Sequence, residues 1–149
     1  MNASNADKTI TIYCRYIRED ETVVLMRRVL YRCSWEDQSI STAMQTGKIL
    51  KESASIRVFC KSSGKTYIPP HEWYVVPEDE LDNYWTVDQR EEAQPLIVPF
   101  ECAWEAGAGT RSDIVRAENA FIRAHPGALR VVQCNDNRKQ RGSHIRLQA

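Results

Sequence analysis

The sequence predicts a mainly β fold, mostly antiparallel, shaped as a β-sandwich or a partly open barrel with one packed α-helix near residues 111–124. Stretches that alternate apolar and polar residues recur along the chain, which is typical of strands. Only one segment repeats apolar residues at helical spacing, whereas a parallel sheet needs a helix between successive strands. The 149 residues fit one domain, which we expect over residues 8–149, after a disordered leader at residues 1–7.

The first two predicted strands form a hairpin. Residues 8–16 alternate with a period of two and are rich in β-branched and aromatic residues, as expected of a half-buried strand. Residues 22–35 form the second strand, and the charged run at 18–21 forms the turn between them. The residues expected to face inward are Ile10, Ile12, Cys14 and Tyr16 in the first strand, and Val29, Tyr31, Cys33 and Trp35 in the second.

The middle of the chain contains shorter and less regular elements. Residues 36–52 are dominated by Ser, Thr, Gln and Gly, so we expect a loop or a weak edge strand there. Residues 55–61 form a third strand, closed by a turn at 62–65. The two prolines at 69–70 exclude a helix interior or a central strand, but the second is suited to begin a short helical turn. Further strands are expected at 73–76 and 96–100.

The predicted helix has a clear beginning and end. Residues 110–113 match the S/T-x-x-D/E pattern, in which each side chain bonds the backbone N–H of the other residue. Apolar residues then recur at helical spacing from 114 to 121, and Pro-Gly at 126–127 ends the helix. The remaining elements, which bring the total to about seven strands, are a strand at 129–134, a turn at 135–137 and a last strand at 142–147.

The composition excludes several classes of protein. The chain has 20 basic and 20 acidic residues and a formal net charge of zero, which argues against a general binder of nucleic acid or anionic membranes. Its longest apolar runs are four residues, whereas a membrane span needs roughly 20, and its start does not resemble a secretory signal. We therefore expect no membrane partner. The five cysteines are odd in number and scattered, which predicts reduced, mostly buried thiols instead of disulfides or a zinc site.

No residue pattern predicts catalysis, and we expect no enzyme activity, cofactor or metal ion. The three histidines, His71, His125 and His144, lie far apart and match no zinc-binding motif. The G-K-T tripeptide at 64–66 lacks the first glycine of a P-loop and precedes prolines instead of a helix. The acidic run after residue 77 lacks the spacing and the turn glycine of a calcium loop.

Opposite charges gather in two parts of the chain. Residues 78–92 carry a net charge of minus six, and residues 138–146 carry plus four. Each part can be a solvated loop, or it can dock on a surface of opposite charge; contacts of the second kind between copies of one chain can close into a ring. We predict an interaction surface that comprises Glu78, Asp79, Glu80, Asp82, Arg138, Lys139, Arg141 and Arg146.

Several short motifs resemble those of a family of uncharacterised prophage proteins from Gram-positive bacteria. The order of features is similar over residues 9–147, although residues 93–95 and the loop at 139–141 differ from the family's pattern. The motifs carry no known chemistry, so no catalytic or cofactor residues come with the resemblance. They are a second strand ending in Trp35, G-K-T-Y-I-P-P at 64–70, Y-W-T at 84–86, an I-V strand at 97–98 and D-N-R at 136–138.

The resemblance implies a role in building a phage particle, because the genes of that family lie beside genes for minor capsid and head–tail joining proteins. We therefore expect a non-enzymatic structural or assembly protein that contacts other phage structural proteins and copies of itself. It would work in the bacterial cytoplasm during assembly and, if incorporated, in the virion. The alternative is a module that contacts single-stranded nucleic acid or DNA through the basic C-terminal hairpin and exposed aromatic residues, as in an OB-fold. Under that alternative the bases would stack on Trp35, Trp73, Trp85 and Trp104, although a tryptophan more often anchors a core.

Overall fold

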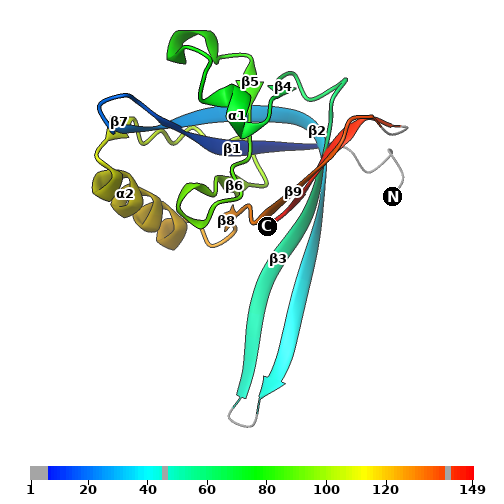
Figure 1. The fold of residues 1–149 in the computed structure, drawn as a ribbon. Helices are drawn as coiled ribbons and strands as arrows, with labels where there is room; N and C mark the ends of the chain where they lie inside the picture. The colour runs from blue at the N-terminus through cyan, green and yellow to red at the C-terminus, as the bar shows by residue number, and fades with distance from the viewer. Residues whose placement is uncertain (1–6, 45–46, 140–141) are drawn as a thin grey trace.

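This computed structural model describes residues 7–44, 47–139 and 142–149, which include ten strands, two α-helices and short 3₁₀ turns at Glu78–Glu80 and Glu91–Ala93. Most strands form a curled, antiparallel half-barrel sheet in the order β8-β6-β1-β2-β3-β10-β9, with β7 added to β2 (Figure 1). This arrangement confirms the predicted mainly β, antiparallel fold with a packed helix. Of the expected leader, residues 1–6 lie outside the described residues. The strands are β1 (Lys8–Ile17), β2 (Val23–Met44), β3 (Gly47–Phe59), β4 (Thr66–Tyr67), β5 (Tyr84–Trp85), β6 (Leu96–Val98), β7 (Ala108–Gly109), β8 (Leu129–Arg130), β9 (Gln133–Asn137) and β10 (His144–Gln148), and the helices are α1 (Pro70–Trp73) and α2 (Arg111–Ala124).

The sheet bends where β2 passes from one half of the barrel to the other. The first part of β2 pairs with β1, and from Ser34 onward β2 pairs with β3. At the bend Ile10 pairs with Leu30 but Lys8 pairs with Cys33, so β2 holds one extra residue there. Arg32, within this bulge, has a left-handed φ of 53°. A bulge of this kind bends a strand and lets it serve two parts of a barrel.

The bulge changes which residues of β2 face the core. Before it Met26 and Leu30 belong to the largest hydrophobic cluster, and after it Cys33 does, so the inward positions switch from even to odd numbers. The predicted inward position of Cys33 is confirmed. That of Tyr31 is wrong, since Tyr31 is 46% exposed. Val29 is buried as predicted, but on the face opposite Leu30.

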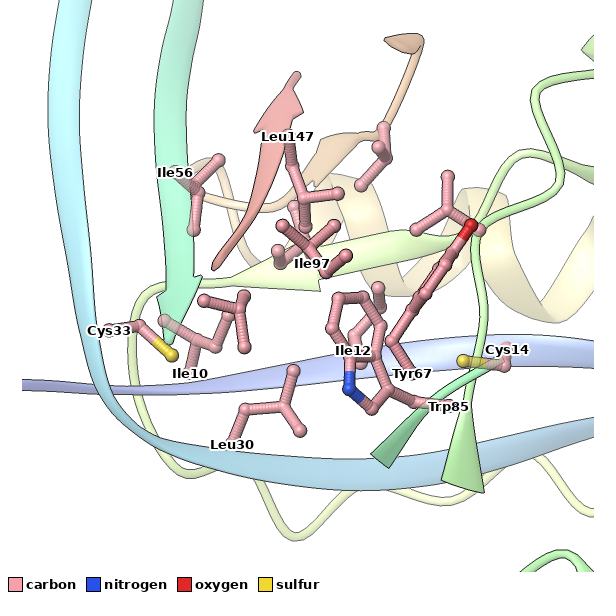
Figure 2. Packing of buried hydrophobic residues seen from close by; sticks show 14 of the residues in the cluster. Ile10, Ile12, Cys14, Leu30, Cys33, Ile56, Tyr67, Trp85, Ile97 and Leu147 are labelled. Atoms are coloured by element: carbon pink, nitrogen blue, oxygen red, sulfur yellow. The ribbon is translucent and has the colours of Figure 1, made fainter. Parts of the chain in front are cut away.

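The β1 strand is buried on both faces. Ile10, Ile12 and Cys14 pack in the largest cluster, as predicted (Figure 2). Tyr13 points to the opposite face, where it is also fully buried and packs near Phe121 of α2. The expectation of a half-buried strand is therefore wrong, because α2 covers the second face of the sheet.

Residues 66–87 cover the main cluster from the other side. Pro70 begins α1, which confirms the predicted helical turn, but Trp73 belongs to this helix, so the strand expected at 73–76 is wrong. The backbone N–H groups of Trp73 and Tyr74 donate to the carbonyl oxygens of Pro69 and Pro70, which continues the helical turn. Trp73 is fully buried, and its indole Nε1 donates to the Arg15 carbonyl oxygen at 2.9 Å.

β2 and β3 continue far beyond the barrel as a two-stranded arm. Its ladder joins Gln38 to Ser53 at the base and Met44 to Gly47 at the far end, and Figure 1 shows it reaching away from the other elements. We call residues 38–44 and 47–53 the arm. Of the two alternatives predicted for residues 36–52, the loop is wrong, and the edge strand is confirmed for the paired residues of β2 and β3. The polar composition hides the strands because a ladder of backbone hydrogen bonds does not need an apolar face.

The C-terminal strands are divided differently from the prediction. β8 ends at Arg130, and β9 includes residues 135–137, which were expected to form a turn. Between these strands the chain changes neighbours, since the Val131 N–H donates to the Pro95 carbonyl and the Val132 N–H donates to the Gln148 carbonyl. Pairing with β10 thus overrides the turn preference of the Asn-Asp-Asn sequence.

Helix α2 agrees with the prediction. The Asp113 N–H donates to Thr110 Oγ1 at 3.2 Å, and the Thr110 N–H donates to Asp113 Oδ2 at 3.4 Å, which completes the capping box. The buried side chains of the helix belong to Ile114, Glu118 and Phe121. No helix among the described residues is both long enough and apolar enough to cross a bilayer.

Candidate functional site

The acidic segment predicted as an interaction surface belongs to the cover over the main cluster. It begins with a short 3₁₀ turn at Glu78–Glu80, and the fully buried Leu81 side chain anchors it. Glu78 is ion-paired with Arg18 at 2.6 Å, and the hydrogen bond from Arg18 holds the pKa of the Glu78 carboxyl below its ordinary value. Asp79, Glu80 and Asp82 are exposed and form an acidic tip.

Among the described basic residues near the C-terminus, Arg138 is engaged by other groups of the chain. Arg138 is ion-paired with Asp136 at 2.7 Å and donates to the Tyr67 carbonyl oxygen at 3.1 Å. Its guanidinium carbon also lies 5.2 Å from the centroid of the Tyr67 ring. Lys139 and Arg146 are exposed, and the predicted Arg141 lies outside the described residues. Because Asp136 balances the charge of Arg138, Lys139 and Arg146 are the described cations of the predicted set that remain available to a partner.

The acidic tip and these two cations stay separate within the described part of the chain. No hydrogen bond or ion pair there joins Asp79, Glu80 or Asp82 to Lys139 or Arg146. The acidic tip and the two cations are therefore available to bind another molecule.

A second basic surface lies on the outer face of β3 and β10. The register sets Arg57 directly across from Arg146, and Phe59 across from His144, with 6.0 Å between the two ring centroids. We call these four residues the outer-face cluster. Like charges directly opposite on neighbouring strands are destabilising, and neither arginine has a carboxylate partner among the described residues. The sequence analysis missed Arg57 and Phe59, although they alternate with inward apolar residues of β3.

Arg15, Glu118 and Arg130 form a buried ionic cluster between β1, α2 and β8. The Glu118 side chain is fully buried and is ion-paired with Arg15, which is 7% exposed, and with Arg130 at 3.3 Å. A buried carboxylate is tolerated only when it is paired and hydrogen-bonded, so this cluster ties the helix to the sheet. The sequence analysis missed it, although Glu118 follows Ile114 by four residues and precedes Phe121 by three, which sets it on the inward face of the helix.

A cavity of about 670 Å³ opens beside this ionic cluster, between the β1–β2 turn, residues 90–93 and the start of α2. Two of its arginines are already engaged, Arg15 by Glu118 and Arg90 by Asp88. Its lining has no cysteine or histidine, and no group of three metal-ligating side chains is found in the part of the chain that the structure describes. The charged lining residues are Arg15, Arg90, Arg111, Asp20, Glu21 and Glu92. Because their charges balance, we assign no ligand to the cavity.

The cysteines are free thiols, as the sequence predicts. Cys14, Cys33 and Cys102 are buried, and Cys60 and Cys134 are partly buried. Burial raises the pKa of the Cys14 thiol to about 11 and that of Cys33 to about 12. These two thiols stay protonated and unreactive at neutral pH.

The tryptophans are less available to nucleic acid than the alternative hypothesis requires. Trp73 and Trp85 are buried in the main cluster. Trp104 stacks on Phe121, with 4.3 Å between ring centroids. Trp35 is partly buried, and its indole Nε1 donates to Asp37 Oδ1 at 2.7 Å. Stacking on bases would therefore have to use other aromatic residues, such as Phe59 and His144.

A family model matches residues 5–149, which is nearly the whole chain, and it describes a family of unknown function, DUF6751. The chain belongs to this family. No curated protein and no solved structure matches it. The description of DUF6751 states no activity, so a prophage origin and a Gram-positive source stay predictions for this DUF6751 chain.

Proposed function

We propose that this DUF6751 chain is a non-enzymatic structural or assembly protein that acts by contacting other proteins, with the arm as its main contact. The observation that carries this proposal is the arm itself. Seven residue pairs, from Gln38 with Ser53 to Met44 with Gly47, extend it beyond the barrel. At about 3.4 Å per residue this is a reach of roughly 24 Å.

The arm is a ladder of only two strands, which continues past Ala54 and Ile56 of β3, two residues of the main cluster. An isolated two-stranded hairpin is at best marginally stable in water. An exposed strand edge is also a ready template for pairing with another chain. A partner that pairs with the arm would therefore stabilise it and bury its unpaired backbone groups.

The resemblance to prophage proteins suggests the setting of these contacts. The partners would be other phage structural proteins, and the role would be that of a minor capsid or head–tail connector protein. The acidic tip and the exposed Lys139 and Arg146 offer further, electrostatic contacts to the same partners.

The test compares the natural chain with a variant that lacks the arm, each expressed within its native gene cluster. Residues 39–52 are replaced by Asn-Gly, because Gln38 and Ser53 are paired and a two-residue turn can close them. Arg116→Gln, an exposed position of α2, is the matched control. Assembled particles are separated by sedimentation, and the chain is quantified in each fraction by immunoblot.

We expect the natural chain and Arg116→Gln to sediment with the particles and the arm-less variant to stay in the slow fractions. Circular dichroism of the purified variant checks that the barrel is still folded. A natural chain found in the slow fractions alone would overturn the proposed role. An arm-less variant that still joins the particles would show that the contact lies elsewhere.

The second candidate function is contact with single-stranded nucleic acid, which the outer-face cluster favours. Two arginines without carboxylate partners beside two aromatic rings match the usual needs of such a surface, which are cations for phosphates and rings for bases. Fluorescence anisotropy with a labelled oligonucleotide tests it. Binding should weaken steeply between 50 and 300 mM salt and be lost when Arg57 and Arg146 are both changed to Gln, but not when Arg116 and Arg123 are. Absence of binding at 50 mM salt would remove this candidate.

A further inference from the structure

The two strands of the arm differ in how well their outer edges are protected. On β3 the arm contains Lys48, Lys51 and Glu52, whereas residues 38–44 of β2 read Q-S-I-S-T-A-M, without a charge or a proline. Natural proteins guard exposed edge strands with charged residues, prolines or bulges to prevent pairing between chains. Charged residues therefore protect the β3 edge of the arm against pairing with another chain, whereas the β2 edge has no such protection.

The open edge is also unpaired in this chain. β1 pairs with β2 only as far as Cys33, and within the described residues 38–44 have no strand partner except β3. The backbone N–H and C=O groups along that edge thus point away from the molecule. Seven uncharged residues are enough for a strand of ordinary length.

We propose that the β2 edges of two copies of this chain pair antiparallel, which joins two arms into one four-stranded sheet. This inference rests on the proposed function, because it names a second copy of the chain as one partner of the arm. An uncharged edge is complementary to its own copy, and antiparallel pairing of identical strands closes around a two-fold axis. The largest overlap of residues 38–44 with themselves has Ser41 at its centre, opposite the same residue of the second copy.

The joined sheet has more strands than the single arm. A two-stranded hairpin on its own is at best marginally stable in water, and further strands stabilise it. Pairing centred on Ser41 sets Ile40 of one copy at the register position opposite Thr42 of the other. Both are β-branched residues, which favour strand pairing.

Charge-swap variants at Ser41 test the inference with purified protein. Ser41→Lys and Ser41→Glu each set two like charges across the proposed axis, which opposes pairing. A mixture of the two variants sets opposite charges there. Sedimentation velocity and light scattering between 5 and 200 μM give the mass of each sample, and Ser41→Thr is the uncharged control. Thermal unfolding checks that every variant keeps its barrel.

We expect a dimer for the natural chain and for Ser41→Thr, and at least a tenfold weaker dimer for each charged variant alone. Mixing the charged variants in equal amounts should restore the dimer. A natural chain that is monomeric at 200 μM, or charged variants that dimerise as well as the natural chain, would overturn the inference. A chain that is monomeric but still sediments with particles would refute the dimer and leave the proposed function intact. A chain that dimerises but never joins particles would refute the proposed function and leave the dimer intact.

Discussion

Replacing Glu118 by glutamine tests the energetic role of the buried ionic cluster. Glu118 is fully buried and Arg15 is 7% exposed, so water cannot take the place of the lost carboxylate charge. Removing one partner of a buried ion pair costs about 3–5 kcal/mol, because the remaining charge stays buried and uncompensated. Arg130 is 30% exposed and can turn toward water, so the cost comes mainly from Arg15. At about 2–4 °C per kcal/mol for a chain of this length, the Tm should fall by roughly 6–20 °C.

Thermal unfolding followed by circular dichroism at pH 7, together with urea titration, measures this effect. Glu101→Gln makes the same chemical change at an exposed position and should alter the unfolding free energy by less than about 0.5 kcal/mol. The double variant Arg15→Met with Glu118→Met should be more stable than Glu118→Gln, because it leaves no arginine buried without a partner. A Tm of Glu118→Gln equal to that of Glu101→Gln would refute the reasoning.

Three further predictions concern pH and backbone strain. Burial raises the pKa of the Asp88 carboxyl, but hydrogen bonds from Arg90 and Tyr74 outweigh burial and hold the pKa below its ordinary value. The folded protein therefore loses stability as the pH falls below about 4. Urea titrations at pH 6 and pH 3 should show a smaller loss of unfolding free energy in Asp88→Asn than in the natural chain. Burial raises the pKa of the Cys33 thiol to about 12. This thiol therefore ionises at a lower pH in the unfolded chain than in the folded one, and stability falls as the pH rises above about 9. Between pH 8 and pH 10.5, Cys33→Ala should lose less unfolding free energy than the natural chain. Arg32→Gly should raise the unfolding free energy by up to about 1 kcal/mol because it relieves a φ of 53°, whereas Arg32→Val should lower it by about 1 kcal/mol or more; equal values for the two variants would argue against strain at the bulge.

Helix α2 shows how far local signals reach. Its cap depends on Thr110 and Asp113, three residues apart, and its inward face on residues three and four apart. All the residues that determine these features lie within one or two helical turns of each other. The helix, the inward face of β1 and the turn at α1 could therefore be predicted from the order of residues.

The candidate surfaces were predicted less completely. The acidic tip is exposed as a charged loop should be, but Arg138 is neutralised by Asp136, which stands only two residues before it. The outer-face cluster depends on Arg57 and Arg146, which the register of β3 and β10 sets side by side. No spacing rule within the sequence connects two residues so far apart in the chain.

The sequence by itself determined the fold class, the capped helix, the free thiols and the separation of acidic and basic segments, because each depends on composition or on residues close in the chain. The tertiary structure decided the bulge at Arg32, the burial of β1 on both faces, the extension of the arm and the pairing of Arg15 with Glu118. That ion pair joins residues 103 positions apart. The physical reason is that strand pairing, and the burial of a strand on its second face, depend on residues that only the folded chain brings together. A local sequence pattern does not contain information about those partners.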